Sequence, residues 1–350
     1  MHSLAPEFLD GLRLTAEHGS ALRLLGEHRG EEELYRRQVP EALETLRTVA
    51  MVESTESSNR LEGIVASPDR LRDMVLRDAR PRDRSEQEIA GYRDGLELIH
   101  ESADHMSFTV NVVQQLHQIL YRYHPSTGGR WKSTQNDIVE RAPDGTILRS
   151  RFRPVSPVAT PGAMDQLTVR WDAAVDQQRE PLIIVPLAIL DLLCIHPFAD
   201  GNGRTARLLT LLLLYRAGYS VGRYMSLERV IEDSRDTYYE ALEHSSNGWH
   251  DGQHDPFPWL EYFWGTLLRA YDEFRERAGA VLEGRGSKTA VVEAAVARRT
   301  APFAISDIEA DCPGVSRDMI RHVLRGLRDQ GMLRAEGRGR AARWIKQGGR

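Results

Sequence analysis

Apolar residues recur three and four positions apart along most of the chain. The spacing is clearest in the stretches 41–52, 110–123 and 259–274, and it is typical of amphipathic helices. Two almost wholly apolar stretches, 181–195 and 208–215, are shorter than the roughly 18–20 residues that a membrane span needs. We therefore predict a mainly α-helical fold with two buried core helices and no membrane contact.

One segment, residues 136–155, breaks the helical spacing. Its apolar residues come in short runs on either side of Asp144 and Gly145, a pair suited to a tight hairpin turn. We predict a small β-hairpin here that projects from the helical body.

The last part of the chain has a different pattern. Residues 276–286 contain few bulky apolar groups and predict a linker. Three helical stretches and then two short strands around a glycine-rich turn follow at residues 287–299, 305–312, 315–333 and 333–346. This order is typical of a winged helix-turn-helix domain, which we place at residues 287–347.

Charge separates the same two parts of the chain. Residues 285–350 hold 14 Lys and Arg against 7 Asp and Glu, which gives this part a charge of +7. Residues 1–284 carry a charge of −12, so the whole chain has a net charge of −5. The arginines of the third helix and the hairpin are Arg317, Arg321, Arg325, Arg328, Arg334, Arg338, Arg340 and Arg343. Such a basic surface suits the phosphate backbone of DNA, but winged helices also bind proteins, and arginine-rich helices are often only solvated. The sequence leaves both binding roles open.

Composition is typical of a globular protein of the cytoplasm. With 41% apolar and 28% charged residues, the chain can bury a large core. Its two cysteines, Cys194 and Cys312, match neither a disulfide framework nor a zinc-ligand spacing. Residues 1–14 lack the basic start and long apolar run of a signal peptide. We therefore expect a cytoplasmic protein.

The stretch HPFADGNGRTAR, residues 196–207, is far more polar than the apolar helices beside it. Pro197 ends the first helix at His196, because proline disfavours helical geometry for the residue before it. A second helix begins at about residue 203, so residues 201–203 lie at its N-terminus. Unpaired backbone amides and the helix dipole attract an anion there, and glycines let the amides come close to it.

Charged side chains surround this predicted anion site. Arg204 and Arg207 share one face of the second helix, where they repel each other and oppose the helix dipole. A polyphosphate in front of the helix would turn that cost into binding. Asp200 would hold a magnesium ion on the phosphates, and His196 would be a base beside them. The structural alternative is a helix-end histidine, a glycine turn and arginines that pair with acids elsewhere.

The same residues resemble the HPFx(D/E)GNGRxxR signature of Fic-domain proteins without a departure. Similarity to the family's flap hairpin, the proline-rich stretch after it and its later helices extends over residues 128–139, 152–167, 234–242 and 259–263. The resemblance implies a Fic core at residues 85–275, preceded by an N-terminal helical region at residues 1–84. It also implies transfer of AMP from ATP to a hydroxyl side chain of a target protein.

The resemblance implies a role for three site residues in the chemistry. His196 would be the general base that takes the proton from the attacking hydroxyl. Asp200 would hold the Mg²⁺ that bridges the α- and β-phosphates. The subgroup that transfers phosphate instead of AMP has lysine at the position of Gly203, so this glycine argues against phosphate transfer.

Nucleotide and target contacts follow from the same resemblance. The expected nucleotide-binding residues are Gly201, Asn202, Gly203, Arg204, Arg207, Tyr238 and Tyr239. Arg204 would bind the phosphates nearest the reaction, Arg207 the γ-phosphate and the tyrosines the base, with buried core tyrosines as the alternative. The flap edge, formed by Asn136, Asp137, Ile138 and Val139, would dock the target by β-augmentation. An ordinary surface hairpin is the alternative.

A stretch near the N-terminus, SSNRLEGIV, is similar to the (S/T)xxxE(G/N) inhibitory motif of some Fic proteins through Ser58, Glu62 and Gly63. Independently, Gly63 predicts the end of a helix at about residues 50–63. Glu62 then lies at the negative end of the helix dipole, where a carboxylate needs a cation. We predict that Glu62 pairs with Arg207 and leaves ATP in an unreactive pose. A solvated glutamate on a capped helix is the alternative.

The sequence leaves three functions open. The first is a protein adenylyltransferase restrained by Glu62, and the second is a regulator whose Fic part senses nucleotide while its winged helix reads DNA. The third is a deAMPylase that uses Glu62 and His196 to remove AMP from a modified partner. Expected partners are a protein with a Ser, Thr or Tyr hydroxyl, the chain itself through self-modification, and a second copy in a homodimer.

Overall fold

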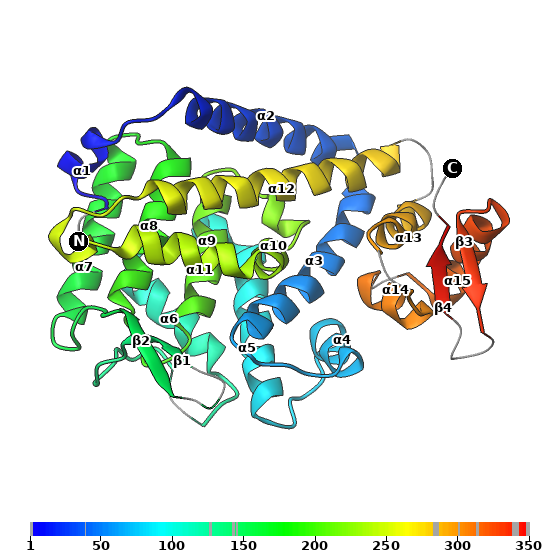
Figure 1. Ribbon diagram of the computed structural model, residues 1–350, viewed down its shortest axis with the longest axis horizontal. Coiled ribbons are helices and arrows are strands. Elements are labelled where there is room, and N and C mark those ends of the chain that lie inside the picture. Colours follow the sequence, from blue (N-terminus) through cyan, green and yellow to red (C-terminus); the bar gives the residue numbers. More distant parts are fainter. Residues whose placement is uncertain are drawn as a thin grey trace.

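Helices dominate the computed structural model, and two antiparallel hairpins account for the strands among the residues that it describes (Figure 1). The described residues are 3–38, 40–125, 128–141, 144, 146–282, 287–299, 302–312, 315–337 and 343–347. The prediction of a mainly α-helical fold with a small hairpin is confirmed. None of the described helices is both long and apolar enough to cross a membrane.

The helical body is built from helices on both sides of the first hairpin in the sequence. Among the described residues, six α-helices precede it. They are α1 (Pro6–Gly11), α2 (Ala16–Gln38), α3 (Pro40–Leu61), α4 (Pro68–Arg77), α5 (Arg84–Ser102) and α6 (Val110–Leu120). The helices after it are α7 (Thr160–Asp176), α8 (Pro181–Ile195), α9 (Asn202–Arg216), α10 (Leu227–Asp233), α11 (Arg235–Ser246) and α12 (Phe257–Leu282).

The two predicted core helices, α8 and α9, lie at the centre of this body (Figure 1). Nearly every side chain of α8 is buried, and α9 is buried from Asn202 to Tyr215 except at single positions. Because helices α7, α11 and α12 pack on α8 while α5 and α6 pack on α9, both have apolar residues on all faces. The short loop between them, residues 196–201, is therefore held between two rigid elements.

Two predicted boundaries differ from the structure. Residues 276–282 continue α12 as a helix instead of forming a linker, and Arg277 and Ala278 are buried there. Residues 283–286 lie outside the described residues. The helix predicted at about 50–63 is longer at its start and shorter at its end, since α3 spans Pro40–Leu61.

The first hairpin consists of β1 (Ile138–Arg141) and β2 (Ile147–Phe152). Ile138 pairs with Phe152, and β1 has no second partner strand among the described residues. The predicted edge of residues 136–139 is therefore wrong in its first half, because Asn136 and Asp137 precede the strand. Gly145 of the predicted turn lies outside the described residues.

Ion pairs fasten this hairpin to α11. The Arg149 guanidinium lies 3.1 Å from Glu243 Oε2 and 2.7 Å from Glu140 Oε2 of the opposite strand. Figure 1 shows the hairpin beside α11 at the lower edge of the molecule. These ion pairs hold the hairpin against α11.

The C-terminal elements have a hydrophobic core of their own, with Ile308, Leu324 and Trp344 among its buried residues. The elements are α13 (Ser287–Ala297), α14 (Ile305–Asp311), α15 (Arg317–Asp329), β3 (Leu333–Glu336) and β4 (Arg343–Lys346). They follow the predicted order, and Phe303 adds an isolated bridge to Trp344. The winged-helix assignment itself stays a prediction.

Acids accompany most arginines of α15. Arg317 lies 2.7 Å from Glu309, Arg321 3.0 Å from Asp318 and Arg328 2.8 Å from Asp329. Arg338 and Arg340 of the predicted wing lie outside the described residues. The described part of this surface is therefore less cationic than the count of arginines suggests.

Candidate active site

His196 caps the C-terminal end of α8 in a left-handed conformation with φ of 52°. Its Nδ1 lies 3.1 Å from the carbonyl oxygen of Leu193. Because a carbonyl only accepts hydrogen bonds, Nδ1 carries the proton and the neutral ring keeps its Nε2 lone pair free. Burial, together with the nearby charge of Lys132, lowers the pKa of His196 to about 4. The side chain is thus held as a neutral base.

The loop after His196 is fixed by hydrogen bonds and ring stacking. Asn202 donates to Phe198 O at 2.8 Å and accepts from Phe198 N at 2.9 Å. The Phe198 ring stacks on His117 with 3.7 Å between centroids. His117 accepts from Gly129 N and so donates through Nε2 to Asp200 O at 3.0 Å. Sequence reasoning missed His117, whose only signal is a polar residue on an otherwise apolar helix face.

The N-terminus of α9 opens onto the same loop. Gly201, with φ of 76°, is its N-cap residue, and no side chain of the described residues caps it. The first amides of a helix lack partners within the helix, so those of residues 202 and 203 are available to an anion. Asp200 is exposed beside them and accepts from Gly201 N at 2.7 Å.

Asp200 fits the single-carboxylate magnesium site that the sequence predicts. The described residues contain no cluster of three or more His, Cys, Asp or Glu side chains that could hold a metal by themselves. Mg²⁺ on a nucleotide needs only one or two protein carboxylates, because phosphate oxygens and waters complete its shell. The donor set is therefore suited to a metal that arrives with phosphates.

Arg207, on the second turn of α9, is almost fully buried and bound to the end of α3. Its Nη2 lies 2.7 Å from Glu62 Oε1 and 2.8 Å from Ser58 O, and its Nε donates to Ser58 Oγ at 2.8 Å. Burial alone would lower the pKa of Arg207, but the charge of Glu62, its hydrogen bond and the nearby Tyr238 and Tyr92 together outweigh burial and raise this pKa. The predicted pair of Glu62 with Arg207 is present.

The end of α3 explains how Glu62 reaches this position. Ile64 N donates to Asn59 O at 3.0 Å and Gly63 N donates to Arg60 O at 2.9 Å. These two bonds define a Schellman motif, in which Gly63 takes φ of 77° and Glu62 is the last residue before the turn. The glycine signal in the sequence therefore placed Glu62 correctly at the end of α3, although the helix itself ends at Leu61.

Gly203 leaves the space that Glu62 occupies. A Cβ atom at residue 203 would lie 2.4 Å from Glu62 Oε1 and 3.2 Å from Arg207 Nη1. Any larger side chain would push the carboxylate away. The glycine therefore serves the contact between α3 and α9 as well as the approach of an anion.

Arg204 does not face this site, and the prediction that it would do so is wrong. Its side chain is 1% exposed, and its Nη1 lies 2.7 Å from Glu88 Oε2 of α5. The guanidinium also lies over the Tyr121 ring, 5.7 Å from its centroid. Because Arg204 and Arg207 point to different helices, each pairs with a separate carboxylate. The structural alternative thus holds for Arg204.

A cavity of about 220 Å³ joins most of the remaining predicted residues, but Ser58, Asn136, Asp137 and Val139 are not part of its lining. Those that line it are Glu62, Ile138, His196, Asp200, Gly201, Asn202, Gly203, Arg207, Tyr238 and Tyr239. Sequence reasoning missed Leu242, Glu243 and Ser246, which complete the wall from α11. They follow Tyr239 at helical spacing, so the period of that helix could have found them.

Comparison with known proteins identifies part of this architecture. Residues 107–214 match the model of the Fic/DOC family. This part of the chain is similar to that family. It is similar to a protein adenylyltransferase Fic of Nematostella vectensis, 29% identical over 167 residues that cover 46% of this chain and 34% of the relative. Protein adenylyltransferase fic-1 of Caenorhabditis elegans is 30% identical over 143 residues, which cover 39% of this chain and 25% of the relative.

The match thus spans about a third of the length of the Nematostella vectensis relative and a quarter of the Caenorhabditis elegans relative. Among solved structures, a Fic family protein from Desulfovibrio desulfuricans G20 is similar with a TM-score of 0.59 and 20% identity, covering 97% of this chain and 98% of the other. A Fic domain containing signaling protein from Bacteroides thetaiotaomicron VPI-5482 has a TM-score of 0.61 and 21% identity, covering 74% of this chain and 97% of the other. Identity this low shows the fold alone.

The matched segment, residues 107–214, holds His196, Asp200 and the N-terminus of α9, but Glu62 and the tyrosines of α11 lie outside it. The contacts of α3 with α9 are therefore features of this chain's structure, beyond what the family match covers. Their geometry has to support any regulatory role by itself.

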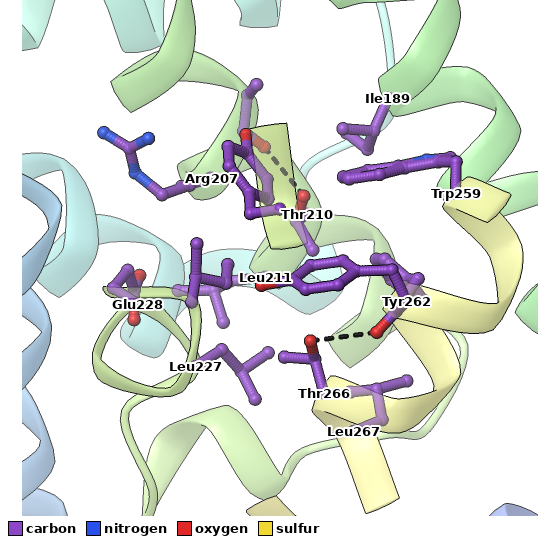
Figure 2. A pocket seen from close by; sticks show the side chains of 14 residues that line it. Ile189, Arg207, Thr210, Leu211, Leu227, Glu228, Trp259, Tyr262, Thr266 and Leu267 are labelled. Atoms are coloured by element: carbon purple, nitrogen blue, oxygen red, sulfur yellow. Dashed lines mark hydrogen bonds between the residues drawn. The ribbon is translucent and has the colours of Figure 1, made fainter. Parts of the chain in front are cut away.

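A second pocket, drawn in Figure 2, shares Arg207 and Tyr238 with the wall of the cavity. It has a volume of about 30 Å³ and lies between α8, α9, α10 and α12, with Trp259, Tyr262 and Leu211 in its wall. The space is close to that of a single water and cannot hold a nucleotide. Tyr238, 4% exposed, is thus a core residue with one edge on the cavity, while Tyr239 faces the cavity more openly.

Ser58→Ala tests how much the hydroxyl adds to the hold on Arg207. We expect AMP transfer by the variant to rise about fivefold, because one hydrogen bond of about 1 kcal/mol is lost while the Glu62 contact remains. The measurement is self-modification with ATP that carries a radioactive α-phosphate. Ser57→Ala is the matched control, since Ser57 is equally buried but points about 100° away around the helix. Equal rates for both variants would contradict the assignment.

Proposed function

We propose that this chain is a protein adenylyltransferase that transfers AMP from ATP to a hydroxyl side chain of a target protein and is restrained by Glu62. One observation carries the proposal: a neutral imidazole with a free Nε2 lies in one cavity with an uncapped helix N-terminus and a buried arginine. The names of the distant relatives support it.

The mechanism follows from the positions of these groups. His196 Nε2 accepts the proton of the target hydroxyl while the hydroxyl oxygen attacks the α-phosphorus. The bond from that phosphorus to the bridging oxygen breaks, and pyrophosphate leaves with the electron pair. The amides of residues 202 and 203 stabilise the negative charge on the phosphate oxygens. Asp200 would hold Mg²⁺, which neutralises phosphate charge when it is bound.

The restraint acts through Arg207. In the structure its guanidinium makes two contacts with Ser58 and one with Glu62. Nε and Nη2 are already engaged and only Nη1 is left, so Arg207 cannot offer the γ-phosphate a bidentate contact. ATP therefore lacks the contact that would hold it in line for attack. Releasing Glu62 would free part of the fork for bidentate phosphate binding.

The target would dock on the open edge of β1. Ile138 lies both in this strand and in the wall of the cavity, so a peptide strand paired with β1 would pass beside His196. Main-chain hydrogen bonds at an edge give affinity with little demand on side chains. This mode suits an enzyme whose targets share a hydroxyl and an extended segment.

A reverse reaction, removal of AMP from a modified protein, is the second candidate. Glu62 is 30% exposed and lines the same cavity as His196, so its carboxylate could orient a water. Label transfer from ATP to protein, compared with release of AMP from labelled protein, separates the two directions.

For residues 287–347 we propose a docking role toward a protein, either the target or a second copy of this chain. The acids beside Arg317, Arg321 and Arg328 weaken the attraction to a phosphate backbone. The full chain should therefore fail to shift random duplex DNA even at low salt. A shift that disappears as salt is raised would instead favour the DNA-reading regulator.

A further inference from the structure

The segment before the first hairpin grips the loop that carries His196. Lys132 donates from Nζ to Ile195 O at 3.0 Å and from its backbone N to Pro197 O at 2.8 Å. Asn136 Nδ2 donates to Phe198 O at 2.7 Å and to His196 O at 3.3 Å. Two residues thus bind the carbonyls of residues 195–198 one after another.

These bonds complete the end of α8. The last four carbonyls of a helix lack partners within it, and here all of them are filled. Leu192 O accepts from His196 N, Leu193 O from the His196 ring and Cys194 O from Val155 N. Ile195 O is left, and it accepts from Lys132. Lys132 therefore satisfies the last carbonyl of α8, next to the residue that carries the His196 ring.

Lys132 is an unusual choice for this place. It is 4% exposed, and the oxygens that its ammonium contacts belong to neutral groups, Ile195 O and Asn136 Oδ1 at 2.8 Å. Burial of a charge costs free energy that a neutral partner offsets only in part, although the negative end of the α8 dipole helps. Burial accordingly lowers the pKa of Lys132 to about 8.

We propose that Lys132 and Asn136 are positioning residues for His196, which together align the imidazole and, through the lysine charge, favour its neutral form. This inference rests on the proposed function, in which a neutral His196 accepts the proton. The pair acts through the backbone of residues 195–198 and does not need to touch the nucleotide.

The charges around His196 come from several elements. Glu62 at the end of α3 and Asp200 in the α8–α9 loop favour the protonated ring, whereas Lys132 opposes it. Arg207 of α9 lines the same cavity, as do Arg151 of β2 and Glu243 of α11. Arg151 pairs with Glu243, and Glu243 also pairs with Arg149 of the hairpin. The charge of Lys132 lowers the pKa of His196, so removal of this lysine should raise that pKa.

The experiment compares Lys132→Met, Lys132→Arg and Asn136→Ser with the control Lys288→Met, all in the Glu62→Gly chain. Lys288 is an exposed lysine of α13. Two readouts are used: kcat and KM for AMP transfer, and the pH titration of the His196 ring by NMR, assigned by its loss in His196→Asn. The titration needs no activity, so it tests the positioning even if the proposed function fails.

For Lys132→Met we expect kcat to fall about 10–100-fold, as a misplaced base does, with KM for ATP unchanged and the pKa of His196 raised. Lys132→Arg should restore the titration and part of kcat. Asn136→Ser keeps the lysine charge, so kcat should fall without a change in the titration. An unchanged kcat and titration in Lys132→Met would overturn the proposal. If that variant does not fold, full kcat in Asn136→Ser would overturn it.

Discussion

Glu62→Gly should raise AMP transfer from ATP to protein about 5–150-fold, the range of a coupling free energy of about 1–3 kcal/mol. The reason is the contact between Glu62 Oε1 and Arg207 Nη2 at 2.7 Å. Without it the guanidinium keeps its two contacts with Ser58 but gains a free edge toward the cavity. Glycine also suits the end of α3, so the helix should persist.

The measurement is label from the α-phosphate of ATP, followed in cell extract and in the purified chain with magnesium. Glu101→Gly is the control, because Glu101 is an exposed acid at the C-terminal end of α5. Equal labelling by the unmodified chain and Glu62→Gly would reject the restraint, provided that both bind ATP.

His196→Ala should lower AMP transfer in the Glu62→Gly chain about 10²–10⁴-fold, the usual contribution of a general base. The structure supplies the reason, since the neutral ring holds Nε2 free inside the cavity while Leu193 O fixes Nδ1. ATP binding should remain, because the helix N-terminus and Arg207 do not depend on the imidazole.

His105→Ala provides the comparison, since His105 is exposed in the short helix after α5. A Glu62→Gly, His196→Ala chain that transfers AMP at the rate of Glu62→Gly would exclude His196 as the base. No labelling in any variant, with ATP still bound, would favour the nucleotide-sensing regulator or the removal of AMP.

The sequence predicts correctly those features that depend on neighbouring residues. Gly63 marked the end of α3, and the glutamate before it reached its cation as predicted. The apolar period marked α8 and α9, and the residues between them formed the loop of the cavity. The ends of these helices depend on residues close together in the chain, whereas Glu62 and Arg207 are 145 positions apart, and their pairing was predicted with the help of the resemblance to the inhibitory motif.

The sequence does not predict the direction of a side chain whose partner lies far away in the chain. Arg204 and Arg207 share a helix face in the sequence, yet Glu88 holds one and Glu62 the other. Asn136 was assigned to the flap edge, but the carbonyls of residues 196 and 198 turn its side chain inward. No spacing within either segment reveals these partners.

The sequence by itself determined the helical class, the histidine and the uncapped helix start, because helix periodicity, proline and glycine act on neighbouring residues. Only the tertiary structure decided which arginine reaches the cavity, that Gly203 makes room for Glu62, and that Lys132 closes α8. These outcomes depend on which groups from separate helices compete for one buried donor or acceptor. That competition is settled by packing, since a buried polar group must find a partner wherever the fold brings one.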